Sequence, residues 1–301
     1  MIVFSAKKFL RSRMPLKLLE FRRAILKKRL RNYFLTLNIT HQNPEILPII
    51  EYYKENDYSV FPYAYTKKYY SLAQDIKIYE DASCKMRYVI HKNKQLYFPN
   101  NLNCEDTRNY YAGLLMEQDE DSPHRYETDK FTVKKGDIIA DMGTAEGFWA
   151  LENAEKSGKI YLFECDNYWI QALQETFKPW KEKTVIINKY ISDTTKGNNI
   201  ALDDFLNGNP INFIKADIEG AEILLLKGAK KTLAAQNNLK LILCSYHEKN
   251  DEKILTKFLK EMGYNTEHSK GYMTFFTDRN SKTPYLRRGI IRAVKHNREI
   301  Q

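Results

Sequence analysis

The sequence predicts an α/β protein whose mostly parallel sheet is covered by helices on both faces. From residue 137 onward, short apolar strands alternate strictly with helical stretches, an order that favours parallel strands joined by crossover helices. The first strand leads through a glycine-rich turn into a helix, and the second strand ends in a carboxylate, Glu164. Together these observations indicate a Rossmann-like sheet with a site for an adenosine-containing cofactor.

Apolar runs locate the strands of this sheet, and amphipathic runs between them locate the helices. We expect strands at 137–141, 159–163, 184–188, 211–217 and 239–245, and helices at about 147–157, 168–177, 221–234 and 249–262. After Gly263, the stretches 264–268 and 272–277 predict a terminal antiparallel hairpin joined through Gly271.

Charge and composition divide the chain into four regions. They are a basic amphipathic helical arm at 1–40, a mainly helical cap region with a hairpin at 41–125, a cofactor-binding domain at 126–280 and a basic tail at 281–301. In the cap region we expect a hairpin of residues 87–91 and 95–98, then a helix at about 105–118. Tyrosines are concentrated in residues 51–70. They either stack on the rings of a ligand or pack in the protein with their hydroxyls at the solvent-exposed edge, and we favour the second interpretation.

The basic arm holds most of the net charge of +10. Between residues 7 and 31 it has eleven Lys or Arg and one acid, with leucines and other apolar residues interleaved. This pattern predicts an amphipathic helix. Such a helix suits peripheral contact with an anionic membrane, binding to nucleic acid, or packing of its apolar stripe on the protein's own domain, and we keep these alternatives.

Composition disfavours several classes of protein. With 43% hydrophobic and 13% aromatic residues, a chain of 301 residues can form a packed core and is not wholly disordered. The sequence has no run of about 18 apolar residues and no apolar signal-peptide core near residue 1, which disfavours a membrane span and secretion. The cysteines Cys84, Cys104, Cys165 and Cys244 form no Cys-x-x-Cys pair, so we expect free thiols, no zinc cage and a cytoplasmic protein.

The first turn distinguishes between cofactors. A dinucleotide site needs a glycine where Ala145 stands, because the pyrophosphate approaches the backbone there. Glu146 would put a negative charge against a pyrophosphate, and Asp141 at the strand tip adds a second carboxylate. These acids suit a ligand with a cationic end, such as the amino group and sulfonium of S-adenosylmethionine (SAM). We therefore expect SAM to contact the other residues of this turn, which are Gly143, Thr144 and Gly147.

In open parallel sheets, ligands bind beyond the carboxyl ends of the strands. Those ends hold Asp141, Glu164, Asp193, Asp217 with Glu219, and His247. Glu164 lies about 20 residues after the turn and can accept hydrogen bonds from two ribose hydroxyls. Asp193, just past the third strand, either reaches the adenine amino group or forms an Asx turn.

The fourth strand carries the most specific pattern, Ile214-Lys215-Ala-Asp217-Ile-Glu219-Gly220. If the chain stays extended, Lys215, Asp217 and Glu219 point to one side. A lysine beside two acids keeps them ionised, which suits a general base or an ammonium clamp. His247 ends the fifth strand, has an unperturbed pKa of about 6.5 and is our first candidate for the catalytic base, with Asp217 second. Two carboxylates are few ligands for an ion, so we expect no metal.

Five motifs stand out along the predicted sheet. They are Asp141-Met-Gly143, Phe163-Glu164, Leu202-Asp203-Asp204, Ile214-Lys215-Ala-Asp217-Ile-Glu219-Gly220-Ala-Glu222 and Leu226-Lys227-Gly228-Ala229. Together they resemble the FkbM-type methyltransferase domain, a class I SAM-dependent O-methyltransferase group of glycan and polyketide pathways. The similarity covers roughly residues 126–275, although Thr144-Ala145-Glu146 departs from the Ala-Asn-x usual in that family.

The resemblance implies a class I methyltransferase sheet with a terminal antiparallel hairpin. It also implies that Asp141, Gly143 and Glu164 contact the cofactor. The residues that it places toward the acceptor are Asp217, Glu219 and His247.

These patterns predict a SAM-dependent O-methyltransferase for a hydroxyl of a sugar or cell-surface glycan precursor. His124 and Arg125 in a polar loop suit an anionic group, such as a phosphate on a lipid-linked or nucleotide sugar, and Lys215 is a further substrate contact. Two alternatives are an RNA methyltransferase that uses the basic arm and a non-catalytic SAM-binding scaffold. The first is disfavoured because Asp217-Ile-Glu-Gly220 lacks the prolines and aromatic typical of enzymes that methylate exocyclic amines of nucleic acids.

Overall fold

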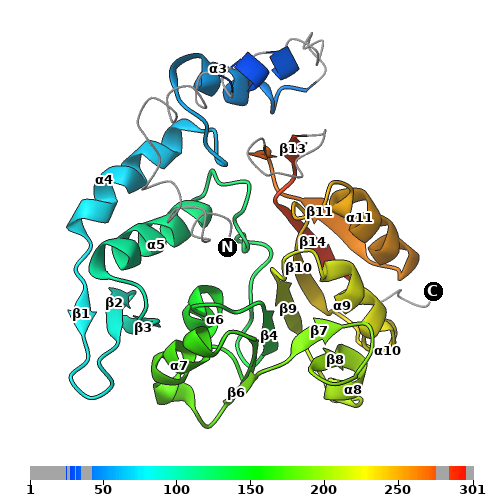
Figure 1. The fold of residues 1–301 in the computed structure, drawn as a ribbon. Helices are drawn as coiled ribbons and strands as arrows, with labels where there is room; N and C mark the ends of the chain where they lie inside the picture. Colours follow the sequence, from blue (N-terminus) through cyan, green and yellow to red (C-terminus); the bar gives the residue numbers. More distant parts are fainter. Residues whose placement is uncertain (1–24, 26–27, 31, 35–42, 276–284, 296–301) are drawn as a thin grey trace.

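The computed structural model describes residues 25, 28–30, 32–34, 43–275 and 285–295 (Figure 1). Within them lies one large sheet, built from β4 Ile138–Met142, β5 Lys159–Phe163, β6 Thr184–Ile187, β9 Phe213–Ala216, β10 Lys240–Cys244, β11 Asn265–His268 and β14 Ile290–Val294. The strand order is β11-β14-β10-β9-β4-β5-β6. Strands β10, β9, β4, β5 and β6 pair in parallel, and β14 is antiparallel to both of its neighbours. The predicted mostly parallel sheet is thus confirmed.

Alternation along the strands sends side chains into two separate cores. In β4, Ile139 belongs to one core and Ala140 to the other. The first core is covered by α6 (Phe148–Asn153) and α7 (Asn167–Thr176). The helices over the second core are α8 Leu202–Leu206, α9 Glu222–Gly228, α10 Lys230–Ala235 and α11 Asp251–Glu261. Helices therefore cover both faces, as the alternating sequence predicts.

The helix expected at 221–234 is interrupted. Ala229 separates α9 from α10 with a backbone φ of -114°. A Cβ added at Gly228 would lie 2.2 Å from the carbonyl oxygen of Ser192, in β7 (Tyr190–Ser192). The end of α9 therefore packs directly on the backbone of β7, and the helix stops at the glycine that permits this contact.

The antiparallel end of the sheet differs from the predicted hairpin. The partner of β11 is β14, which lies between β10 and β11. Residues 272–277 were expected in that place, but β12 (Met273–Thr274) pairs with β13 (Leu286–Arg287) outside the main sheet. The prediction of 272–277 as the partner strand is wrong because the apolar run of β14, four of whose five residues are buried, fits a central strand better.

Basic residues of the expected tail at 281–301 bond to the fold. Arg292 lies in β14, is buried, and donates hydrogen bonds to the backbone carbonyls of Arg125 and Tyr126. Arg288 forms an ion pair with Glu45, with its Nη2 atom 2.7 Å from Oε2. These arginines serve internal contacts, so they do not form a free basic surface.

The third strand of the sheet is shorter than predicted. It ends at Ile187, where Asn188-Lys189 breaks the apolar run. The chain then forms β7, which pairs in parallel with β8 (Asn199–Ala201) in a separate two-stranded sheet. Asp193 follows β7 and is exposed, so its expected place directly after the third strand is wrong.

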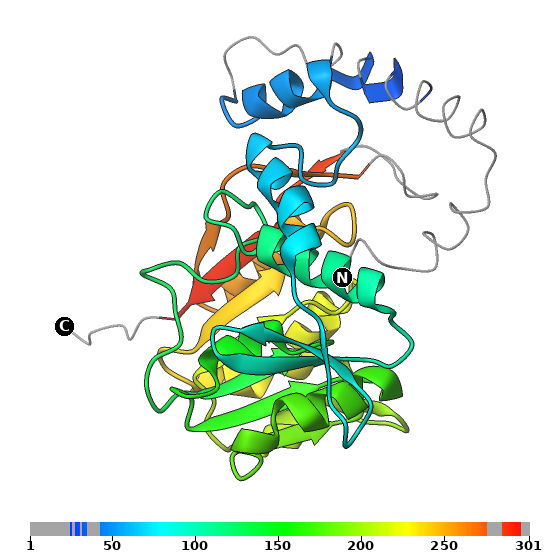
Figure 2. The same ribbon diagram turned by 90° about the vertical axis from the view of Figure 1, so that its left-hand side faces the viewer.

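Strand β3 of the cap region packs against α6 and α7, on the side of the sheet that these helices cover (Figure 2). Its elements are α3 Leu47–Glu55, α4 Lys67–Asp75, α5 Cys104–Glu117, β1 Tyr79–Glu80, β2 Arg87–His91 and β3 Lys94–Phe98, with a short 3-10 turn at Ala64–Thr66. Strands β2 and β3 form the predicted hairpin, and α5 is the predicted helix. The Asn103 side chain caps α5 by accepting a hydrogen bond from the backbone N–H of Asp106.

Several tyrosines of residues 51–70 pack against the segment that precedes and includes β12. The hydroxyl of Tyr58 donates to the carbonyl of Thr274, and that of Tyr63 donates to the carbonyl of Tyr272. Tyr53 also exchanges a hydrogen bond with the Thr274 hydroxyl. These contacts support the packing interpretation over a stacking platform.

Most of the basic arm lies outside the described residues. In the part that is described, Leu30 and Phe34 are buried in a cluster with Ile49 and Leu286. None of the helices in the described part of the chain is both long enough and apolar enough to span a membrane.

Candidate functional site

The glycine turn fastens β4 to its two neighbouring strands. The backbone N–H groups of Gly143 and Thr144 donate to the carbonyl of Phe163 at the end of β5, and the Thr144 hydroxyl donates to the carbonyl of Asp141. Gly143 has a φ of 70°, and a Cβ there would lie 2.0 Å from the carbonyl oxygen of Asp217. The close approach of the chain after β9 therefore requires Gly143, and the Thr144 hydroxyl serves the turn itself.

Glu164 lies beside this turn at the tip of β5. Its carboxylate accepts hydrogen bonds from the backbone N–H groups of Ala145 at 2.7 Å, Cys165 at 2.7 Å and Asp166 at 2.8 Å. Gly147, with a φ of 79°, starts α6 beyond the turn and packs on α7. The carboxylate predicted to bind the ribose is thus held in a fixed place next to the turn.

Asp141 and Lys215 form a buried ion pair below the turn. They are directly opposed residues of β4 and β9, and their charged atoms lie 2.9 Å apart with side chains at most 5% exposed. Burial raises the pKa of Asp141, while the charge of Lys215 opposes that rise. Lys215 Nζ also donates to the carbonyl of Gly143 and lies over the ring of Tyr126. The predicted substrate contact Lys215 therefore supports the turn from beneath.

Asp217 is the centre of the site. It directly follows β9, and its carboxylate accepts hydrogen bonds from the hydroxyls of Tyr126 at 3.0 Å and Tyr246 at 2.9 Å. Burial by itself would raise the pKa of Asp217, but the positive charges near it, among them His247 and Lys215, hold that pKa well below its usual range. Asp217 is therefore a charged hydrogen-bond acceptor and a weak base.

His247 is held between two carboxylates. Its Nε2 atom lies 3.2 Å from Asp217 Oδ1, and its Nδ1 atom lies 3.1 Å from Glu222 Oε1. Burial would lower the pKa of His247, but the two carboxylates next to its ring raise that pKa to about 10. In this arrangement His247 is an imidazolium that fixes Asp217, and neither ring nitrogen is a free base.

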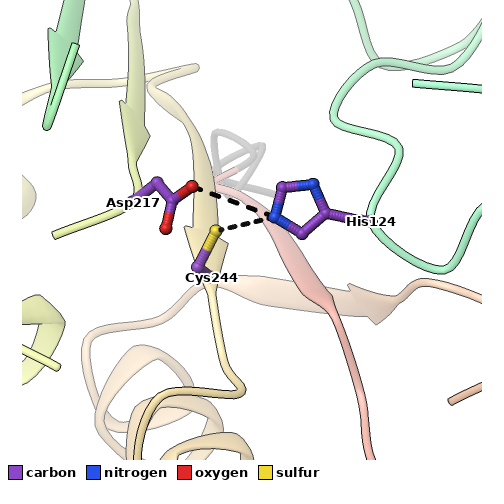
Figure 3. A group of neighbouring side chains, drawn as sticks. All are labelled: His124, Asp217 and Cys244. Carbon is purple, nitrogen blue, oxygen red and sulfur yellow. Dashed lines mark hydrogen bonds and ion pairs between the residues drawn. The ribbon is translucent and has the colours of Figure 1, made fainter. Parts of the chain in front are cut away.

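His124 and Cys244 complete the cluster around Asp217 (Figure 3). His124 comes from the loop that precedes β4, and Cys244 is the last residue of β10. The Nε2 atom of His124 lies 3.7 Å from Cys244 Sγ, 3.9 Å from Asp217 Oδ2 and 3.1 Å from the Tyr246 hydroxyl. Burial lowers the pKa of His124 to about 3, so its imidazole is neutral. Nitrogen, oxygen and sulfur donors thus converge at one point.

The cap region adds further polar groups to this end of the sheet. Glu117, the last residue of α5, has its Oε2 atom 3.9 Å from Nδ1 of His124. Burial raises the pKa of Glu117 to about 7. The Tyr110 hydroxyl, also on α5, donates to the carboxylate of Glu146 in the turn. Carboxylates outnumber cations in this described part of the molecule. The carboxylates are Glu117, Asp141, Glu146, Asp217 and Glu222, and the cations are Lys215, His247 and Arg287.

A family model described as the Methyltransferase FkbM domain matches residues 69–266. The chain belongs to the FkbM methyltransferase family. Its mostly parallel main sheet is the Rossmann-like class I methyltransferase sheet that the sequence predicts, although β14, and not residues 272–277, is its antiparallel strand. A search of curated proteins found no match.

Solved structures of several methyltransferases are similar to this FkbM domain. An FkbM methyltransferase of Methylobacillus flagellatus is 18% identical, with a TM-score of 0.43, over 75% of this chain and 58% of that one. The chain thus spans little more than half the length of that relative. An rRNA methylase of Streptococcus thermophilus is 14% identical, with a TM-score of 0.39, over 55% and 90% of the two chains. A candidate tRNA (m1A22) methyltransferase of Streptococcus pneumoniae, in complex with S-adenosyl-L-methionine, is 14% identical, with a TM-score of 0.36, over 56% and 70%.

The predicted residue Glu219 stands apart from the Asp217 cluster. Strand β9 ends at Ala216, and Glu219 has a φ of 56° and is exposed. The extended backbone that would align Glu219 with Asp217 therefore does not continue, and that premise is wrong. Arg125 is half-buried, and its backbone carbonyl accepts a hydrogen bond from Arg292.

Sequence reasoning missed several residues of the cluster. Cys244 and Tyr246 lie just before His247, so the strand-end rule that selected His247 could also have selected them. Glu117 and Tyr110 reach the site because α5 packs over this end of the sheet. No sequence motif predicts that packing.

Proposed function

We propose that this FkbM domain is a SAM-dependent O-methyltransferase for a hydroxyl of a sugar or cell-surface glycan precursor. One arrangement carries the proposal: Glu164 is fixed beside the glycine turn, and carboxylates outnumber cations around Asp217. SAM matches both features, because its ribose offers two hydroxyls and its methionine end carries an ammonium and a sulfonium.

The residues of the turn and of the β5 tip fit the cofactor as a set. Glu164 would accept hydrogen bonds from the ribose, and the backbone from Gly143 to Gly147 would line the neighbouring part of SAM. Asp193, exposed after β7, is our proposed contact for the adenine amino group. Bound SAM supplies a methyl group on a cationic sulfur, and the ion pair of Asp141 with Lys215 lies below the turn.

The acceptor is proposed to lie beside Asp217. Its charged carboxylate can accept a hydrogen bond from a sugar hydroxyl and orient the oxygen in line with the methyl group, an alignment that supplies much of the rate of such transfers. His247 keeps this carboxylate in place through their ion pair. His124 is buried and neutral, so of the predicted pair only Arg125 suits an anionic group on the acceptor.

The substitution Glu164→Gln tests the cofactor half of the proposal. We expect SAM binding, measured by calorimetry, to weaken about 10- to 100-fold, because charge-assisted hydrogen bonds to the ribose contribute about 1.5–3 kcal/mol. Glu182→Gln is the matched control, because the side chain of Glu182 is 89% exposed. Equal affinity of wild type and Glu164→Gln would contradict the placement of the ribose.

Incubation with methyl-labelled SAM and glycan precursors tests the acceptor. We expect label in a base-stable ether on a sugar. Label in RNA would instead support the nucleic-acid alternative, and SAM binding without any transfer would support the scaffold alternative; either result would overturn the glycan proposal.

The described cysteines are free thiols, which supports the proposed cytoplasmic location because reducing compartments keep thiols free. We further propose that residues 7–31 contact an anionic membrane surface, where a lipid-linked acceptor would be available.

A further inference from the structure

We propose that His124, Asp217 and Cys244 form a binding site for Zn²⁺ with one coordination position left for a further ligand. The three residues come from three separate elements: the loop before β4, the chain directly after β9, and the end of β10. Figure 3 shows the imidazole, the carboxylate and the thiol pointing toward one another. The His124 ring is 1% exposed and Cys244 is fully buried.

The spacing of the donor atoms fits a small tetrahedral ion. Zinc at about 2.0–2.3 Å from its ligands separates the donor atoms by roughly 3.3–3.7 Å. In the structure, His124 Nε2 lies 3.7 Å from Cys244 Sγ and 3.9 Å from Asp217 Oδ2, and all three donors lie within 4.8 Å of one another. A contraction of a few tenths of an ångström, or somewhat more between Asp217 and Cys244, would bring them to zinc-binding distances.

The donor set selects the metal. A thiolate beside an imidazole is typical of Zn²⁺ sites, whereas Mg²⁺ and Ca²⁺ take oxygen ligands. Three protein ligands are characteristic of zinc sites that act on a bound molecule, because structural zinc sites have four. Water or a substrate atom would have to supply the fourth ligand.

The surroundings of His124 support the assignment. Its Nδ1 atom is buried and lacks a hydrogen-bond partner in the described part of the chain, while Glu117 Oε2 lies 3.9 Å away. With a metal on Nε2, the ring proton must sit on Nδ1 and face this carboxylate, which is the arrangement that zinc-binding histidines usually have. The hydroxyls of Tyr126 and Tyr246 already orient the Asp217 carboxylate in a similar way.

A second group of possible donors, Asp217, Glu222 and His247, fits a metal less well. His247 faces Asp217 with Nε2 and Glu222 with Nδ1. A single ion would have to bind one nitrogen of His247 together with both carboxylates. The two carboxylates face different nitrogens of the ring, so one ion cannot reach all three residues. This group is better described as an imidazolium between two carboxylates.

The use of the site rests on the proposed function, although zinc binding itself does not. A hydroxyl bound at the open position would lose its proton to solvent more readily, because zinc lowers the pKa of bound oxygen acids. The resulting oxygen would form a bond to the methyl carbon of SAM as the carbon–sulfur bond breaks. The electron pair of that bond stays on sulfur and leaves a neutral thioether. Zinc would thus supply the activation that His247, held between carboxylates, does not.

Metal analysis of the full-length protein tests the site. After dialysis against a chelator and titration with ZnSO₄ and a competing dye, we expect one Zn²⁺ per chain. Cys244→Ser changes one atom in the core and should weaken zinc binding at least 10-fold. His124→Ala should do the same, and Cys104→Ser is the matched control because Cys104 is exposed. With CoCl₂ in place of zinc, a thiolate-to-cobalt absorption band should appear in wild type and Cys104→Ser and be absent from Cys244→Ser.

Wild type that takes up no stoichiometric zinc, or a cobalt band that survives in Cys244→Ser, would overturn the site. Circular dichroism of each variant separates loss of the ligand from loss of the fold, and Asp217→Asn offers a third ligand change if His124→Ala does not fold. Calorimetry with SAM on the zinc-loaded protein separates this proposal from the proposed function. Zinc binding without SAM binding would leave the site standing and refute its use in methyl transfer.

Discussion

Gly143 places the two halves of the site next to each other. Its own backbone belongs to the turn that faces the cofactor, and the absence of a side chain lets the carbonyl of Asp217 approach from the end of β9. Asp217 then presents its carboxylate to Tyr126, Tyr246 and His247. The absence of a Cβ atom at Gly143 thus sets the distance between the turn and Asp217, the carboxylate proposed to orient the acceptor.

The substitution Gly143→Ala should lower the free energy of unfolding by about 2–4 kcal/mol, because the new Cβ would overlap a backbone carbonyl at a positive φ. Gly136→Ala is the matched control: Gly136 has a φ of 88°, but a Cβ there would meet nothing within 4 Å. Backbone strain alone should make Gly136→Ala lower the free energy of unfolding by about 1 kcal/mol. Urea unfolding measures both, and equal losses would contradict the argument from the clash.

Removal of the Lys215 charge should leave the Asp141 carboxylate buried without its partner. We expect Lys215→Met to destabilise the fold by about 3–5 kcal/mol. Lys257→Met is a suitable comparison, because Lys257 lies 3.9 Å from Glu261 with side chains 79% and 63% exposed, and such surface pairs contribute about 0–1 kcal/mol. Similar losses in thermal or urea unfolding would show that the Asp141–Lys215 pair is not a buried ion pair.

At the scale of elements, β14 connects the sheet to the loop that carries His124. Arg292 in β14 donates to the backbone carbonyls of Arg125 and Tyr126. Gly289, just before the strand, lets the carbonyl of Pro123 approach, since a Cβ at Gly289 would lie 2.1 Å from that oxygen. The strand therefore positions His124 above β9 and β10 as well as completing the sheet.

A second link joins the start of α3 to the corner between β13 and β14. The Arg288 guanidinium donates to both carboxylate oxygens of Glu45, at 2.9 Å and 2.7 Å. The hydrogen bond from Arg288 lowers the pKa of Glu45. Because the folded-state pKa lies below the unfolded value of about 4.3, this stabilisation is full at neutral pH and is lost as the pH falls through the folded pKa.

Glu45→Gln should therefore destabilise the protein by about 1 kcal/mol at pH 7, and the difference from wild type should shrink toward zero below about pH 3. Glu51→Gln is the control, because the side chains of Glu51 and Lys54 are 66% and 61% exposed. Urea unfolding across this pH range measures both. A Glu45→Gln deficit that stayed constant with pH would show that the pair is not charge-dependent.

At the scale of the whole molecule, the cap region closes one end of the sheet and brings α5 to the site. The arm at residues 7–31 adds a strongly basic segment to this assembly. Leu30 within it, and Phe34 just beyond it, are buried against the protein's own core. The membrane proposal therefore depends on the bases of the arm rather than on its whole apolar stripe.

Charge reversal of three bases, Lys27→Glu, Lys28→Glu and Arg29→Glu, should reduce binding of the full chain to anionic vesicles by 100-fold or more, because each base near the surface contributes about 1 kcal/mol. Cosedimentation with phosphatidylserine-containing vesicles measures this effect, with pure phosphatidylcholine vesicles as the reference. Reversal of three exposed bases outside the arm, Lys67, Lys181 and Lys257, is the control for net charge. Equal losses in the two variants would refute a specific role of the arm.

The sequence by itself determined the alternation of strands and helices, the glycine turn and Glu164 at the tip of β5. These features depend on periodicity and on neighbours close in the chain, which a single sequence displays directly. The fourth-strand motif also located Lys215 and Asp217, since parallel strands end at a common edge.

Only the tertiary structure decided which groups meet at Asp217 and in what state of charge. His124 and Cys244 are 120 residues apart in the chain. They meet because β14, which lies between β10 and β11, holds the loop that carries His124 through hydrogen bonds from Arg292. The charge of His247 follows from two carboxylates that fold around it, and the neutrality of His124 follows from its burial. Contacts and desolvation of this kind arise from packing between distant segments, so no local pattern encodes them.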